Sequence, residues 1–157
     1  MTTLNTLDDN TTGAVNAASV TSITGTLAKL LTAYGSNGIT GLGNEAISVS
    51  ETGVGSSLAA SDLNSLDSKT SGTITTANGL LTLTGTVAAL NTAYGSAGLS
   101  IQGDEAITIT DTTLDAGDLN ILNNYTTGLV TATSVTTLTG TLADINAAYA
   151  AVASSGN

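Results

Sequence analysis

The sequence predicts an α/β fold, a repeat solenoid of five strand-turn-strand-helix coils with stacked parallel strands and short helices on one flank. Near-copies of one phrase recur along the chain, each copy alternates apolar and hydroxyl residues, and apolar residues at helical spacing follow each alternation. The phrases are SITGTLAKLLTAYGS from Ser22, LTLTGTVAALNTAYGS from Leu81 and TLTGTLADINAAYAA from Thr137.

The spacing of glycine and tyrosine defines the repeat. The Gly of the TGT phrase falls at 25, 85 and 140, at intervals of 60 and 55, and Tyr34, Tyr94 and Tyr149 keep the same intervals. A second phrase lies between these copies, GLGNEAISVSET (41–52) and IQGDEAITITDT (101–112). Both phrases reduce to one unit that opens at a Gly (13, 38, 72, 98, 128) and reaches a Thr 13 or 14 positions later (26, 52, 86, 112, 141). We therefore expect a single solenoid domain over 1–157, with a helical remnant at 1–12 and coils at 13–37, 38–71, 72–97, 98–127 and 128–157.

A strand is predicted in each unit just before that Thr. The residue three positions earlier is always apolar: Ile23, Val49, Leu83, Ile109 and Leu138. The residues on both sides of it always carry hydroxyl groups, which predicts an exposed hydroxyl array made of Ser22, Thr24, Ser48, Ser50, Thr82, Thr84, Thr108, Thr110, Thr137 and Thr139. This alternation of period two, rich in β-branched residues, is typical of a half-buried strand.

A short helix is predicted after each strand. Leu27, Leu30, Leu31 and Tyr34 follow i, i+3, i+4, i+7 spacing, and the i, i+3, i+7 part recurs from Val87 and from Leu142. DLNSL (62–66), DLNIL (118–122) and LNTL (4–7) predict shorter apolar ridges. We expect helix N-caps at Thr26, Thr86 and Thr141, and left-handed C′ positions at Gly35 and Gly95. Asp144 lies at N3 of the last helix, where a negative charge is favourable.

Composition excludes several classes of function. The 157 residues include two basic residues, Lys29 and Lys69, against twelve acids, for a net charge of −10. Nucleic-acid binding is excluded because phosphates need clustered cations, and anionic membrane surfaces are disfavoured for the same reason. No apolar run approaches the ~18–20 residues of a membrane span, so no membrane insertion is expected. The start, MTTLNTLDDN, lacks a signal-peptide pattern and resembles LNSLDSKTSG (63–72), so we expect the chain to begin within a repeat.

No catalytic constellation is visible, and we expect no enzyme activity and no cofactor. There is no His to serve as a base and no Cys for a disulfide or a thiolate metal site. The Gly-Asp-Glu and Gly-Asn-Glu phrases favour side-chain-capped turns. Calcium remains an alternative, since hard oxygen ligands are present. Its candidate ligands are Asp104, Glu105, Asp111, Asp115 and Asp118.

Two further rows of side chains favour structural roles. An Asn follows the helix Leu or Ile in five of the six predicted helices, and the side-chain amides are expected to bond along the stack or to cap neighbouring loops. These residues are Asn5, Asn64, Asn91, Asn120 and Asn146. The repeated Tyr is expected at the edge of the core with its hydroxyl group in water.

SVTTLTGTLADINAAYA, GLGNEAISVSET and LAASDLNSLDSKTSG resemble the tandem repeats of giant secreted or cell-surface bacterial proteins, of the cyanobacterial type. The resemblance implies export, an extracellular or cell-surface location, and a spacer, coat or adhesive role. Relatives of this kind carry calcium-binding G-G-x-G-x-D nonapeptides, which this sequence lacks.

The leading hypothesis is therefore a non-enzymatic structural or spacer segment of a large extracellular protein. Its partners would be the neighbouring repeats of the same parent chain, with end-to-end self-association through exposed terminal coils. One alternative is an ice-binding module that uses the Ser/Thr-x-Ser/Thr array, and another is a carbohydrate- or surface-adhesive module. Helices need about 10 Å of width and strands about 4.8 Å, so the stack should twist rather than present the flat plane that ice requires.

Overall fold

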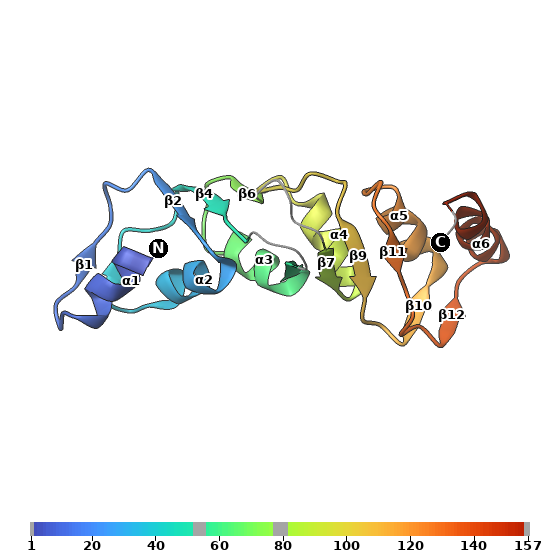
Figure 1. The fold of residues 1–157 in the computed structure, drawn as a ribbon, viewed down its shortest axis with the longest axis horizontal. Coiled ribbons are helices and arrows are strands. Elements are labelled where there is room, and N and C mark those ends of the chain that lie inside the picture. Colours follow the sequence, from blue (N-terminus) through green and yellow to red (C-terminus); the bar gives the residue numbers. More distant parts are fainter. Residues whose placement is uncertain (1, 52–55, 77–81, 156–157) are drawn as a thin grey trace.

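The computed structural model describes residues 2–51, 56–76 and 82–155, and it is a mixed α/β molecule (Figure 1). Within these residues six helices and twelve strands follow one another along the long axis, with the first and last helices at opposite ends. The helices are α1 (Thr2–Asp9), α2 (Leu27–Gly35), α3 (Ala60–Asp67), α4 (Val87–Gly95), α5 (Ala116–Asn123) and α6 (Leu142–Ser155). The first six strands are β1 (Val15–Asn16), β2 (Ser22–Gly25), β3 (Ile39–Thr40), β4 (Ala46–Val49), β5 (Ser57–Ala59) and β6 (Ile74–Thr76). The last six are β7 (Thr82–Gly85), β8 (Leu99–Ser100), β9 (Ala106–Ile109), β10 (Thr113–Asp115), β11 (Val130–Thr131) and β12 (Thr137–Thr139).

Every strand pair is parallel, and the two strands of a pair are far apart in the chain. Paired residues lie 23 to 27 positions apart, from Ile107 with Val130 to Ile47 with Ile74. The ladders are β1-β3, β2-β4-β6-β8, β5-β7-β9-β11 and β10-β12. The helices pack in sequence order, each against the next from α1 to α6. The prediction of parallel strands with short helices is therefore confirmed.

The predicted number of strands is wrong for two units. Residues 39–59 form three strands before α3, and residues 99–115 form three strands before α5, where two were expected. The extra strands β5 and β10 each start a new ladder, β5-β7-β9-β11 and β10-β12, while β4 lies between β2 and β6 in a separate ladder. The ladders consequently shift along the molecule, and none contains more than four of the described strands.

The predicted register is wrong by two residues in the same units. Ile23 pairs with Ile47 rather than with Val49, and Leu83 pairs with Ile107 rather than with Ile109. A shift of two leaves the buried face unchanged because strand side chains alternate with period two. The additional buried residue, Val49 or Ile109, lies opposite Gly25 or Gly85, where no side chain competes for space. Thr52, the predicted end of one strand, lies outside the described residues.

The predicted helices are all present, but two of their ends differ from expectation. Gly35 and Gly95 are the last helical residues of α2 and α4, and neither has the positive φ expected for a C′ glycine. The chain instead leaves each helix through an extended Ser, Ser36 or Ser96. Ala150 takes the place of this Gly in the last unit, and α6 continues to Ser155 because Ala favours helix far more than Gly does.

The apolar positions of strands and helices form one large hydrophobic cluster and one small one. A continuous cluster runs from Ile23 to Leu122, and it includes Leu63 and Leu66 of α3 and Leu90 of α4, all fully buried. A smaller cluster at the N-terminal end contains Val15, Ala17, Ala33 and Ile39. The described helices include none with the length and apolar character needed to cross a membrane.

Leu83→Asp is expected to unfold the chain cooperatively, because Leu83 is 0% exposed and lies in the middle of the continuous cluster. An unpaired buried carboxylate costs several kcal/mol, about as much as the whole stability of a domain. Leu142→Asp is the matched control, since Leu142 is 75% exposed and should tolerate the same change. Circular-dichroism melting of both variants tests this, and an unchanged melting temperature for Leu83→Asp would contradict the core described here.

Candidate functional site

The ten predicted hydroxyl residues do not form one array. Thr24 lies beside Ser48 on the β2-β4 pair, and Thr84 lies beside Thr108 on the β7-β9 pair, but these pairs belong to different ladders. Thr137 and Thr139 lie in a third ladder, beside Thr113 and Asp115 of β10. Three hydroxyl residues that the sequence pattern missed extend the first two rows: Thr75, Ser100 and Thr131. They were missed because their strands were not aligned with the predicted ones.

Half of the predicted hydroxyl residues are only partly exposed. The exposed ones are Ser22, Thr24, Thr110, Thr137 and Thr139, and the partly buried ones are Ser48, Ser50, Thr82, Thr84 and Thr108. Some of these hydroxyl groups also bond to the neighbouring strand. Thr84 Oγ1 donates to the Leu58 carbonyl at 3.3 Å, and Thr139 Oγ1 donates to the Leu114 carbonyl at 3.2 Å. Such side chains serve the ladder rather than a flat external plane.

The five calcium-ligand candidates have separate positions. Asp111 accepts from the Val87 amide at 2.8 Å, and Asp115 caps α5 by accepting from the Gly117 amide at 2.8 Å. Asp104 and Asp118 are exposed, whereas Glu105 is buried. Among the described residues no three acidic, His or Cys side chains converge into a group that could hold a metal ion.

Two buried glutamates are the main feature that sequence reasoning missed. Glu45 and Glu105 are 0% and 1% exposed, and each closes the turn that precedes β4 or β9. Glu45 accepts from the Gly43 amide at 2.9 Å, and Glu105 accepts from the Gly103 amide at 2.9 Å. The capped turn was predicted, but the capping side chain is the Glu rather than the exposed Asn44 or Asp104. The repeated Gly-Xaa-Glu phrase was the signal that could have identified it.

Each buried glutamate also accepts a hydrogen bond from a helix tyrosine. Tyr34 at the end of α2 donates to Glu45 Oε2 at 2.6 Å, and Tyr94 at the end of α4 donates to Glu105 Oε2 at 3.2 Å. The expectation that these hydroxyl groups lie in water is therefore wrong. Each tyrosine joins the helix of one unit to the turn of the next, 11 residues later.

The electrostatics of the pair favour a neutral phenol and an ionised carboxylate. Burial, followed by the hydrogen bond to Glu45, raises the pKa of Tyr34 well above its usual value, and burial beside the Glu105 charge does the same to the pKa of Tyr94. Burial alone would raise the pKa of Glu45. The hydrogen bonds from Tyr34 and from the turn amides outweigh this effect, and the pKa of Glu45 lies below its usual value.

Other polar side chains also bond from one unit to the next. Glu51 accepts from the Leu27 amide at 2.7 Å, so the N-terminus of α2 is capped from the following unit while the predicted cap, Thr26, forms no side-chain cap bond. The predicted caps Thr86 and Thr141 do accept from the amides three residues later, those of Ala89 and Asp144. Asp144 also accepts from the Thr141 hydroxyl, which makes this a reciprocal pair.

The predicted asparagine row bonds along the molecule, although the acceptors are backbone carbonyls rather than other amides. Each Nδ2 donates to a helix carbonyl of the next unit at 2.9 to 3.2 Å. The pairs are Asn5 with Lys29, Asn64 with Ala89, Asn91 with Asp118 and Asn120 with Asp144. Asn146 is exposed and forms no such bond within the described residues.

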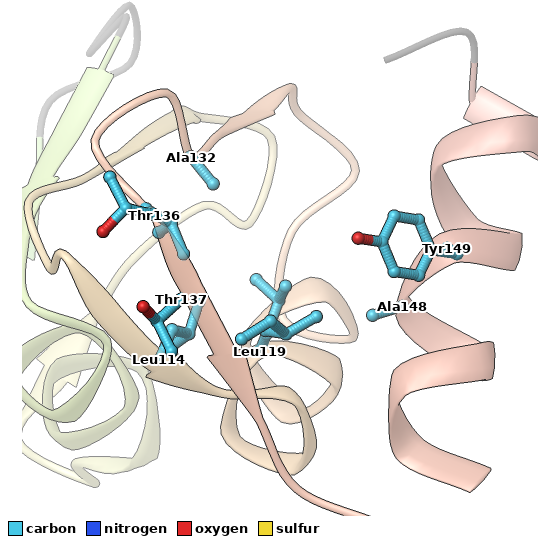
Figure 2. A pocket seen from close by; sticks show the side chains of 9 residues that line it. Leu114, Leu119, Ala132, Thr136, Thr137, Ala148 and Tyr149 are labelled. Carbon is cyan, nitrogen blue, oxygen red and sulfur yellow. The ribbon is translucent and has the colours of Figure 1, made fainter. Parts of the chain in front are cut away.

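A hollow of about 300 Å³ lies at the C-terminal end, between α6 and the β10-β12 pair. Figure 2 shows Tyr149 and Ala148 of α6 on one side of it, with Leu119 and Ala132 opposite. Tyr149 is 67% exposed, whereas its counterparts Tyr34 and Tyr94 are partly buried against glutamates. The lining offers one phenol and otherwise apolar and threonine side chains, which is no catalytic set.

No family model, no curated protein and no solved structure matches this chain.

Tyr34→Phe is expected to lower the free energy of unfolding by about 1.5–3 kcal/mol, because it removes a hydrogen bond to a charged, buried acceptor. Tyr149→Phe is the matched control and should change stability by less than about 0.5 kcal/mol, since Tyr149 is largely exposed. Urea denaturation measures both values. Equal effects of the two variants would show that the bond between Tyr34 and Glu45 contributes nothing.

The same pairs predict how stability depends on pH. Since the pKa of Glu45 is lowered by folding, its stabilising effect is complete above its ordinary pKa of 4.5 and is lost as the pH falls through the lowered value. The pKa values of Tyr34 and Tyr94 are raised by folding, so their effect is complete below pH 10.0 and declines as the pH rises above it. Melting temperatures from pH 3 to 12 should fall at both ends. Tyr34→Phe with Tyr94→Phe should flatten the alkaline fall, and an unchanged alkaline slope would contradict this assignment.

Proposed function

We propose that the chain is a non-enzymatic structural or spacer segment of a large extracellular or cell-surface protein, built as a five-coil repeat solenoid. The proposal rests on one observation: the buried or helix-capping acidic side chains of the chain form hydrogen bonds between units. Glu45, Glu51, Glu105 and Asp111 each bond to the preceding unit, and among the described residues no three acidic side chains converge into a group that could hold a metal ion. These acidic side chains are thus engaged in hydrogen bonds between units, as a spacer requires.

The parallel ladders and the sequential helix contacts support the solenoid reading. Each unit is expected to complete the hydrogen bonds and cover the apolar face of the one before it, so that length can be added without a change of design. The proposed partners are the neighbouring repeats of one parent chain. The extracellular location rests on the resemblance to giant bacterial repeat proteins.

The ice-binding alternative receives less support from the geometry. Its hydroxyl groups are divided among three ladders, and Thr84 and Thr139 direct hydrogen bonds toward neighbouring carbonyls. A row of at most four strands covers about 14 Å at a strand spacing of ~4.8 Å. The adhesive alternative draws no support from the hollow beside α6, whose lining is apolar apart from Thr136, Thr137 and Tyr149.

The spacer proposal predicts an elongated particle without thermal hysteresis. Small-angle scattering of the full chain should give the distance distribution of a rod, and nanolitre osmometry should detect no thermal hysteresis. Thr84→Lys with Thr110→Lys should leave freezing unchanged with a modest loss of stability. Thermal hysteresis that the double variant abolishes would instead identify an ice-binding module, and saturable binding on a glycan array would identify an adhesive one.

A further inference from the structure

An acidic strand is held in the same way at two places inside the molecule. The segments GNEAISVSE (43–51) and GDEAITITD (103–111) contain β4 and β9 and lie parallel to β2 and β7. In each segment the Glu accepts from the tyrosine of the preceding helix, and the acid six residues later accepts from the first amide of the same helix. A strand edge, a helix N-terminus and a tyrosine together form the receiving surface.

The last unit has the same receiving surface. TLTGTLADINAAY (137–149) differs little from TLTGTVAALNTAY (82–94), so Thr137–Thr139, Leu142 and Tyr149 correspond to Thr82–Thr84, Val87 and Tyr94. β12 pairs with β10 on one side, and no described strand pairs with its other edge. Leu142 is 75% exposed, whereas Leu27 and Val87, its counterparts, are 4% and 3% exposed. Figure 1 places β12 and α6 at the end of the molecule.

The hydrogen-bonding groups of this surface are unused donors. Within the described residues, the Leu142 amide and the Tyr149 hydroxyl group form no hydrogen bond, whereas both counterparts bond to carboxylates in the interior. The hollow between α6 and the β10-β12 pair is lined mainly by apolar side chains, including Leu138 and Val135. The surface therefore matches an occupant with two carboxylates and an apolar residue between them.

We propose that the free edge of β12, the N-terminus of α6 and Tyr149 bind an extended acidic segment as an added parallel strand. The occupant has the pattern Gly-Xaa-Glu-Ala-Ile-Xaa-Ile-Xaa-Asp, with its Glu accepting from Tyr149 and its Asp accepting from the Leu142 amide. Strand addition supplies the affinity through backbone hydrogen bonds, and the two carboxylates fix the register.

A second copy of this chain fits the surface less well. Among the described strands at its other end, β1 and β2 each have a free edge. On β2, Thr21 stands where the interior segment has Glu45, since Ser22 pairs with Ala46. The position that corresponds to Glu51 is Leu27, which is apolar. A copy stacked through β2 would thus bring neither carboxylate to the donors.

Asp144 sets the affinity of the proposed site. It lies two residues after Leu142 and bonds to the Thr141 hydroxyl group, whereas the corresponding residues of α2 and α4 are Lys29 and Ala89. Its negative charge repels the carboxylate of an incoming segment, so this site binds more weakly than its interior counterparts. Removing the charge should therefore tighten binding.

The test uses the full chain, labelled with ¹⁵N, and a synthetic peptide with the sequence of residues 101–113. NMR titration should give saturable 1:1 shifts confined to residues 132–149 and to Leu114 and Leu119, which line the same hollow. The chain with Tyr149→Phe should bind about 10-fold more weakly, because one hydrogen bond to a charged group is lost, and the peptide with Glu105→Gln and Asp111→Asn about 100-fold more weakly, because two charged acceptors are lost. Asp144→Ala should bind a few-fold more tightly, and Tyr125→Phe, which changes a tyrosine outside this surface, should bind as the unaltered chain does.

A covalently joined peptide keeps the test decisive if the free peptide binds too weakly, since a free peptide loses conformational entropy when it binds. The same peptide is joined after residue 157 through a flexible Gly-Ser linker of about 12 residues, which raises its effective concentration to the millimolar range. The joined chain should melt at a higher temperature than one carrying the amide-substituted peptide. Equal melting temperatures, shifts centred away from β12, α6 and the hollow between them, or self-association of the unaltered chain that the peptide does not displace would overturn the proposal.

Discussion

The hydrogen bond from a helix tyrosine to a carboxylate buried in the next turn is the interaction on which the arrangement of the units depends. A fully buried Glu is costly unless its charge is compensated by donors, and here the turn amides and the phenol supply them. Removing any donor leaves a charge in the interior, so helix, turn and following strand must all be in place together. Gly128, whose Cβ would overlap the Glu105 carbonyl, shows how closely the next unit approaches this turn.

The distribution of charge follows from the same need. A chain with a net charge of −10 could be expected to present acidic patches to a ligand. Instead Glu51 and Asp111 face helix N-termini, where the backbone amides and the helix dipole favour negative charge, and Glu45 and Glu105 face turn amides. The backbone supplies most of the positive potential that Lys and Arg supply in other proteins, which accounts for a fold with only two basic side chains.

The sequence was sufficient for the helices and for most strands, but it missed β5 and β10 and did not determine how the strands align. Helical spacing correctly placed α2 and α4, and the alternation of period two correctly placed the buried faces of β2 and β7. The same alternation could not distinguish Ile47 from Val49 as the partner of Ile23, because both face the core. The sequence also did not reveal that Glu105 is buried, because a Glu beside an Asp is typical of an exposed turn. Its burial depends on Tyr94, which lies 11 residues earlier, and only the packing of one unit on the next brings them together.

The stepwise shift of the ladders has a consequence for anything that lies along this molecule. Each ladder ends after at most four described strands, and a new one begins to the side of it at β5 and β10. A row of side chains on one ladder therefore ends within four described strands, and the next row lies on a different ladder. A rigid, straight neighbour such as a crystal face or a polysaccharide fibre would meet one row over only a few strands. A fibril that grows by adding strands to an exposed edge would likewise have only a few strands of one ladder as its template.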